Sequence, residues 1–137
     1  MASIHVNGID LYYEVHGSGM PLVMLHGNGE DHTTFSTLCA ALQDRFQIFL
    51  FDTRGHGKST PVSEYHYSDM AQDMTEALIQ LFDGPIDLLG FSDGGIIALF
   101  LAIWYPQLVR RMILCGANYH PYGIKEEGRR DMRAEYA

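Results

Sequence analysis

The chain has 137 residues, of which 47% are hydrophobic and 19% are charged. This balance predicts one folded domain with a buried core and excludes a disordered chain, which combines low hydrophobicity with high net charge. The formal net charge of −8 argues against nucleic acid as a partner, because phosphate backbones are also negative. We interpret the acidic balance as a determinant of solubility, with steering of cationic substrates as the alternative.

The chain opens with two short strand patterns at residues 3–6 and 11–15. The Asn7-Gly8 pair between them is typical of a tight hairpin turn. Residues 21–25 form a continuous apolar run, which predicts a strand buried on both faces, as in a parallel sheet.

Strand-like and helix-like segments alternate along the rest of the chain. In order they are a helix ending at Leu42 with Asp31 or Thr33 as its cap, a strand at 47–51, a helix from Ser68 as cap to Phe82, a strand at 86–89, a buried helix at 96–104 and a buried strand at 112–115. This alternation predicts an α/β fold: a mostly parallel, twisted sheet of about six strands with helices on both faces.

The two cysteines, Cys39 and Cys115, lie far apart in apolar surroundings. Without a Cys/His spacing typical of zinc, we expect both to be buried, reduced thiols of a cytoplasmic protein. The N-terminus shows no secretory signal pattern, and the longest apolar run, residues 96–105, is too short to span a bilayer. We therefore expect no membrane association, no metal and no cofactor.

The segment Gly90-Phe-Ser92-Asp-Gly94 carries the clearest chemical motif. It lies between a buried strand and a buried helix, which is the context of a nucleophile elbow with Ser92 as the nucleophile. Such a sharp turn leaves little room, and the two glycines supply it because they lack a Cβ. The alternative is an ordinary serine in a tight turn between strand and helix.

A second motif, His26-Gly27-Asn28-Gly29, follows the first buried parallel strand. In the elbow architecture this loop contributes one backbone N–H, and the residue after the nucleophile contributes another. We therefore expect the amides of Asn28 and Asp93 to form the oxyanion hole of a tetrahedral intermediate. The alternative for these glycines is simple turn chemistry.

With Asp52-x-Arg54-Gly-x-Gly-x-Ser59 between them, these motifs resemble the α/β-hydrolase fold family in order and approximate spacing over essentially the whole chain. The elbow version Ser92-Asp-Gly-Gly95 resembles that of the valacyclovir hydrolase-like esterases. The resemblance implies the strand order 1-2-4-3-5-6 and acyl transfer on an ester or amide. Aspartate at position 92 would instead have indicated an epoxide hydrolase or a dehalogenase.

Two further expectations concern acidic residues near these motifs. We expect Asp52 and Arg54 to tie a loop together rather than to bind substrate. The Asp93 carboxylate has two open interpretations: it attracts the ammonium group of an amino-acid ester, as the resemblance suggests, or it is solvated near a helix N-terminus, where acids are favoured.

Compared with the family, the acid and the histidine of the catalytic triad have no counterpart here. In this fold they follow the serine in the order acid, then histidine. After Ser92 the sequence offers His120, which precedes Asp131 in the reverse order, so we interpret His120 as a cap-region residue. Five other histidines have no position that indicates catalysis: His5, His16, His32, His56 and His66.

The chain therefore resembles the N-terminal half of a hydrolase without the last two strands and the cap. We expect residues 1–118 to be hydrolase core and 119–137 to begin a cap-like segment. One functional hypothesis is a serine hydrolase of small esters or amides that is nearly inactive alone. The other is a non-catalytic half-domain that forms a homo-oligomer, or complements a second chain, through the open sheet edge near residues 111–115.

Overall fold

The computed structural model describes residues 2–117. The expected cap-like segment at 119–137, with His120 and Asp131, lies outside the described residues. The elements in chain order are β1 (Ala2–Val6), β2 (Ile9–His16), β3 (Met20–Leu25), the 3₁₀ turn η1 (His32–Phe35), α1 (Ser36–Leu42), β4 (Phe46–Phe51), α2 (Tyr67–Leu81), β5 (Ile86–Phe91), α3 (Asp93–Trp104), the 3₁₀ turn η2 (Pro106–Leu108) and β6 (Val109–Cys115).

The strands form one six-stranded sheet in the order β1-β2-β4-β3-β5-β6, which confirms the expected order. β3 pairs in parallel with β4 and β5, and β5 pairs in parallel with β6. β2 is antiparallel to β1 and β4. The β1–β2 hairpin turns at Asn7 and Gly8, whose φ angles of 46° and 80° fit the tight turn that this pair predicts.

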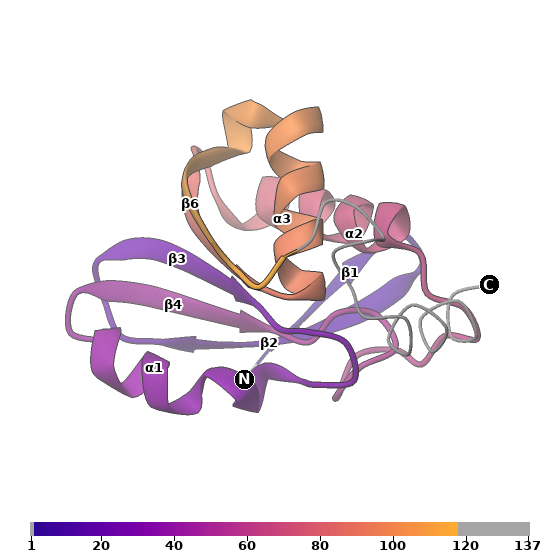
Figure 1. Cartoon of the computed structure of the whole chain (residues 1–137), viewed down its shortest axis with the longest axis horizontal. Helices are drawn as coiled ribbons and strands as arrows, with labels where there is room; N and C mark the ends of the chain where they lie inside the picture. Colours follow the sequence, from indigo (N-terminus) through magenta and orange to yellow (C-terminus); the bar gives the residue numbers. More distant parts are fainter. Residues whose placement is uncertain (1, 118–137) are drawn as a thin grey trace.

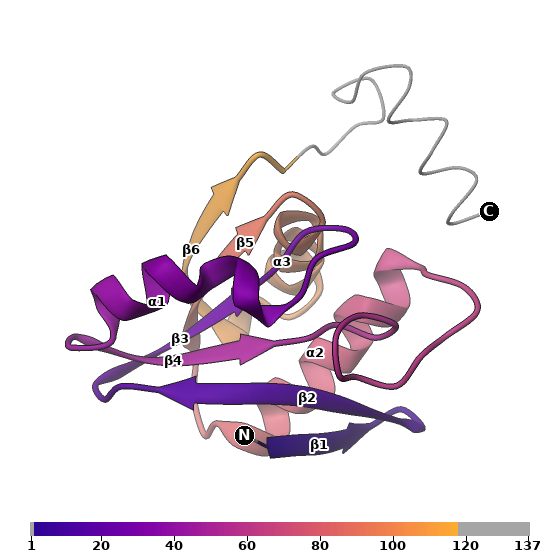
Figure 2. The same ribbon diagram turned by 90° about the horizontal axis from the view of Figure 1, so that it is seen from below.

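Helices cover both faces of the sheet, as expected. Figures 1 and 2 show α1 on one side and α2 with α3 on the other. On the α1 side, Phe35 and Cys39 pack with Met24 of β3 and Ile48 of β4. The larger cluster lies on the opposite face, where α2 and α3 bury their apolar sides against the sheet; it includes Leu11, Val23, Phe51, Met70, Met74, Leu78, Ile97 and Leu101.

Two helix caps differ in detail from expectation. Asp31 is the cap, but of η1: its side chain accepts a hydrogen bond of 2.9 Å from the Thr33 amide, and α1 follows this 3₁₀ turn. Ser68 is not a cap, because α2 already begins at Tyr67 and the extended residue His66 occupies the cap position. His66 makes no side-chain cap hydrogen bond, so α2 is held by its buried apolar face rather than by its first turn.

The expected burial of α3 and β6 is only partly correct. Ile103 is 74% exposed and Ile113 is 58% exposed. Cys115 is also exposed, which corrects the expectation of a buried thiol, whereas Cys39 is buried. The reason is topological: β6 is the last strand of the described sheet and pairs only with β5.

None of the helices within residues 2–117 is both long and apolar enough to cross a membrane.

Candidate active site

Ser92 occupies the strained turn that a nucleophile elbow requires. It lies between β5 and α3 with φ 52° and ψ −115°, and it is one of two non-glycine residues with positive φ in the described chain. Its amide donates a 2.8 Å hydrogen bond to the Cys115 carbonyl, and its own carbonyl accepts from Gly95 and Ile96 at 2.9 and 3.2 Å. The turn is therefore fixed from both sides, by β6 and by the first turn of α3.

The glycines of the motif are required by close backbone approach. A Cβ built on Gly90 would lie 2.5 Å from the carbonyl oxygen of Gly94. A Cβ on Gly94 would meet the backbone carbonyls of Leu25 and His26 at the end of β3. Backbone atoms cannot move aside as a side chain can, so glycine is required at position 90 for the close approach to the start of α3 and at position 94 for the close approach to the end of β3.

The 26–29 loop lies directly beside Ser92. A Cβ on Gly27 would be 3.3 Å from the Cβ of Ser92, and the Gly27 amide donates a 2.9 Å hydrogen bond to the Glu30 carboxylate. Asn28 and Gly29 are exposed next to it. The structure thus brings together the two motifs that the sequence predicts to form one site, although they lie more than sixty residues apart.

Asp93 is the first residue of α3 and is only 5% exposed. The hydroxyl of Tyr67, at the start of α2, donates a 3.0 Å hydrogen bond to its carboxylate. This burial corrects the interpretation of Asp93 as a solvated acid at a helix N-terminus. The carboxylate instead lies between α2 and α3, one residue away from the elbow serine.

Asp52 and Arg54 both have structural partners, but they do not pair with each other. Asp52 is fully buried and accepts hydrogen bonds from the His32 amide at 2.7 Å and the Lys58 amide at 2.9 Å. Arg54 forms a two-pronged ion pair with Asp73 of α2, at 2.6 and 2.8 Å. Burial and these contacts favour a structural role for both residues over a role in substrate binding. Each residue has its own partners, whereas we expected Asp52 and Arg54 to tie one loop together.

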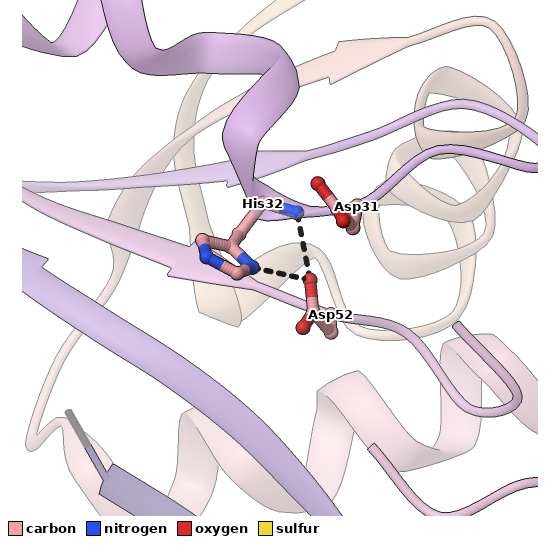
Figure 3. A group of neighbouring side chains, drawn as sticks. All are labelled: Asp31, His32 and Asp52. Carbon is pink, nitrogen blue, oxygen red and sulfur yellow. Dashed lines mark hydrogen bonds and ion pairs between the residues drawn. The ribbon is translucent and has the colours of Figure 1, made fainter. Parts of the chain in front are cut away.

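One group of side chains in the described part of the chain has the atoms to hold a metal ion: Asp31, His32 and Asp52 (Figure 3). Its atoms already have partners within the protein. His32 Nδ1 donates to Asp52 at 2.9 Å, His32 Nε2 lies 3.2 Å from Glu14, and Asp31 caps η1. We therefore interpret the group as a hydrogen-bonded tie between η1 and the end of β4.

Sequence patterns gave no role to His56, yet it lies in the buried centre of the loop region. His56 is 7% exposed and His26 is 1% exposed, and their ring centroids are 5.1 Å apart. Burial lowers the pKa of His26 below its usual value, so its ring favours the neutral form. The only sequence signal was the position of His56 between two loop glycines, which does not distinguish a buried ring from an exposed one.

A pocket of about 480 Å³ lies beside the 26–29 loop. It is lined by Gly29, Glu30, Asp31, Thr33, Thr34, Gly55, His56, Gly57 and Tyr65. Ser92 is not among these residues, so this pocket neighbours the predicted nucleophile without containing it.

The sheet order and the elbow together are those of the α/β-hydrolase fold. The model of the α/β-hydrolase fold family matches residues 20–134, and the chain belongs to this family. Among proteins of known name, the chain is 34% identical to the mouse serine hydrolase BPHL over 135 residues, covering 93% of this chain and 46% of BPHL. It is 32% identical to the zebrafish sn-1-specific diacylglycerol lipase ABHD11, covering 83% of this chain and 40% of that protein.

Solved structures of esterases have the same fold over the matched region. An esterase from Exiguobacterium antarcticum has a TM-score of 0.80 at 36% identity and covers 90% of this chain and 47% of its own. A thermophilic esterase from Thermogutta terrifontis has a TM-score of 0.83 at 29% identity and covers 96% of this chain and 49% of its own. The chain therefore spans about half the length of the relatives it matches.

Proposed function

We propose that this chain provides the nucleophile and the oxyanion hole of a serine hydrolase of carboxylic esters or amides. The observation that carries the proposal is the strained Ser92 at the start of α3 with the 26–29 loop packed against it. The named hydrolase and esterase relatives support the same reaction class.

In this mechanism the Ser92 hydroxyl attacks the substrate carbonyl carbon and gives its proton to a general base. The carbonyl oxygen becomes an oxyanion, which accepts hydrogen bonds from the amides of Asn28 and Asp93. The intermediate collapses as the C–O or C–N bond breaks, and the leaving group takes the proton. Water then hydrolyses the Ser92 ester and restores the hydroxyl.

The mechanism needs a general base that accepts the proton of Ser92. Between Ser92 and the end of the described residues the sequence contains no histidine. We propose that the histidine and its acidic partner are not part of this 137-residue chain, and that the chain alone hydrolyses esters far more slowly than a complete serine hydrolase does. An oxyanion hole without a base still gives some catalysis, since removal of triad residues in other serine hydrolases leaves a residual rate.

A fluorophosphonate probe tests this proposal because it labels only an activated serine. We would compare the chain alone with a fusion that adds, after Ala137, the part of mouse BPHL lying beyond the matched segment. We expect the probe to label the chain slowly and the fusion fast. Ser92→Ala should abolish labelling of the fusion, and Ser63→Ala, at an exposed serine, should leave it unchanged. Fast labelling of the chain alone would contradict the missing base, and an unlabelled, folded fusion would contradict the serine hydrolase.

The finer proposal is a preference for amino-acid esters, with the Asp93 carboxylate attracting the substrate ammonium. Its support is the position of this buried carboxylate next to Ser92. Asp93→Ala should then slow the active fusion more on α-amino esters than on neutral esters of the same size. Tyr67→Phe, which removes the hydroxyl that donates to Asp93, is the matched control for a purely structural effect. Equal losses on both ester types would exclude ammonium recognition.

A second candidate function is a half-domain that associates through the β6 edge. Its support is the exposure of Ile113 and Leu114, at 58% and 37%, on a strand that pairs only with β5 in the described sheet. Size-exclusion chromatography should show self-association that Ile113→Lys reduces, or complex formation when a chain carrying the other half is added. A stable monomer that binds no such chain would exclude this candidate.

A further inference from the structure

His26 and His56 form a continuous hydrogen-bonded connection between the 26–29 loop and the loop that follows β4. His26 Nδ1 lies 2.8 Å from the Gly27 carbonyl, and His26 Nε2 lies 3.1 Å from the Thr53 amide. His56 Nδ1 lies 3.0 Å from the Arg54 carbonyl, and the Gly29 amide lies 3.2 Å from His56 Nε2. Each ring thus touches one loop with one nitrogen and the other loop with its second nitrogen.

The partners of these nitrogens determine the proton positions. A carbonyl oxygen only accepts, so Nδ1 of each ring carries a proton. A backbone amide only donates, so Nε2 of each ring must be bare. The Thr53 hydroxyl fits this assignment, because it lies 3.2 Å from His56 Nδ1 and 3.3 Å from His26 Nε2, where it accepts from the first and donates to the second. Both rings therefore hold their loops only as neutral Nδ1–H imidazoles.

We propose that His26 and His56 are positioning residues that hold the 26–29 loop against Ser92 with neutral rings, and that protonation of His26 at Nε2 releases the loop from Thr53. A proton on His26 Nε2 would face the proton of the Thr53 amide, so that contact becomes repulsive. Gly27 lies against the Ser92 side chain, and a displaced loop changes the surroundings of this serine. The link to catalysis depends on the proposed function, whereas the histidine contacts do not.

The groups around the histidine pair have opposite effects on the pKa of His26. Burial is the main cause that lowers the pKa of His26, and the nearby ring of His56 lowers it further, whereas Asp52 and Glu30 raise it. On the pocket side, the ring of Tyr65 packs at 5.2 Å from that of His56. The pocket wall there also carries the carboxylates of Glu30 and Asp31.

The sign of the pH effect follows from the lowered pKa of His26. The unfolded chain takes up a proton near the usual value of 6.5, before the folded chain does. The contribution of a neutral His26 is therefore fully present above about pH 6.5 and decreases as the pH falls below it.

Imidazole 15N spectra of the 137-residue chain test the proton positions directly. At about pH 7.5, where histidine is mainly neutral, both His26 and His56 should show the Nδ1–H tautomer. The exposed His66, whose Nε2 lies 3.2 Å from the Glu64 carboxylate, is the internal reference for the opposite, Nε2–H tautomer. A proton on Nε2 of either buried ring at this pH would overturn the proposal.

Amide hydrogen exchange tests the release of the loop. Protection of the Thr53 amide should fall as the pH is lowered, by up to tenfold for each unit below the midpoint of His26, since the neutral fraction falls by that factor. Glutamine places a non-titrating acceptor near Nε2, so the double variant His26→Gln/His56→Gln should keep the protection and lose its pH dependence. His56→Ala should lower the protection of Gly29 at every pH, and His66→Gln should behave as wild type.

Protection that is independent of pH in the wild type, or equally dependent in the double variant, would overturn the proposal. If the double variant does not fold, His26→Gln alone gives the same comparison at Thr53. These outcomes are separate from the proposed function. If the spectra and the exchange data agree with the histidine proposal but the fluorophosphonate probe does not label Ser92 in the fusion, only the hydrolase assignment is rejected.

Discussion

Arg54 and Asp73 form a nearly buried, two-pronged ion pair that fastens the loop after β4 to helix α2. Their side chains are 15% and 2% exposed, and Asp73 also accepts a 3.2 Å hydrogen bond from Asn7 in the β1–β2 turn. The Asp73 carboxylate, by accepting hydrogen bonds from Arg54, raises the pKa of the guanidinium above its already high value, so Arg54 stays charged. One carboxylate thus joins three segments that are distant in sequence.

Arg54→Ala should destabilise the fold strongly, because it leaves the buried Asp73 charge unpaired. Loss of one partner of a buried ion pair costs about 3–5 kcal/mol of unfolding free energy. Urea denaturation of the wild type and the variant measures this loss. Arg54→Ala/Asp73→Ala should lose less than the sum of the two single variants, and Arg45→Ala at an exposed position should have little effect. Additive losses would mean that the ion pair is not a unit.

A second carboxylate makes the stability of the β6 edge dependent on pH. Asp87 of β5 accepts hydrogen bonds from Arg110 and Arg111 at 3.0 to 3.2 Å, and these arginines lower its pKa below the usual 3.8. Because the pKa of Asp87 is lowered in the folded state, its contribution to stability is complete above about pH 3.8. This contribution is lost as the pH falls through the pKa of Asp87 in the folded state.

Asp87→Asn should therefore reduce stability at neutral pH and remove part of the stability loss of the wild type in acid. Thermal unfolding followed by circular dichroism between neutral and acidic pH measures both effects. Asp44→Asn at an exposed position is the control. If the wild type and Asp87→Asn lose stability in parallel between pH 4 and pH 2, Asp87 does not contribute to the acid sensitivity.

Gly94→Ala should disrupt the elbow, because the new Cβ would run into the carbonyls of Leu25 and His26. Overpacking of this kind costs about 1–3 kcal/mol, and here backbone must move. Gly84→Ala is the matched control: nothing lies within 4 Å of the new Cβ and its φ is not positive, so its stability should be unchanged or slightly higher. Equal midpoints of chemical unfolding for the two variants would contradict the tight fit between elbow and β3.

Ser92→Gly should be more stable than Ser92→Ala, although both lack the hydroxyl. The positive φ of 52° at this position strains any residue with a Cβ, at a cost of about 1–3 kcal/mol. Glycine removes this strain but loses about 0.5–1 kcal/mol in backbone entropy, which leaves a net gain of about 1 kcal/mol. The comparison requires only equilibrium unfolding of the two variants, and an alanine variant that is as stable as the glycine variant would show that the elbow is unstrained.

The amino-acid sequence by itself determined the fold class and the place of the predicted nucleophile. Apolar runs at β3, β4 and β5 marked the parallel strands, and Asn7-Gly8 marked the hairpin, because each of these signals depends on neighbours in the chain. The Gly90–Gly94 motif indicated the elbow for the same reason: a strand, a sharp turn and a helix follow one another directly. The roles of Ser92, Asn28 and Asp93 in catalysis stay predictions.

The tertiary structure decided which side chains meet. Periodicity carries no information on a contact between residues of different elements, so Asp73 could not be identified as the partner of Arg54, nor His56 as a partner of Gly29. It also decided burial: Asp93 proved buried under Tyr67, and Cys115 proved exposed, because exposure depends on which elements cover a strand or a helix. A residue's neighbours along the chain determine its local conformation, whereas its charge state and its contacts depend on the segments that folding brings around it.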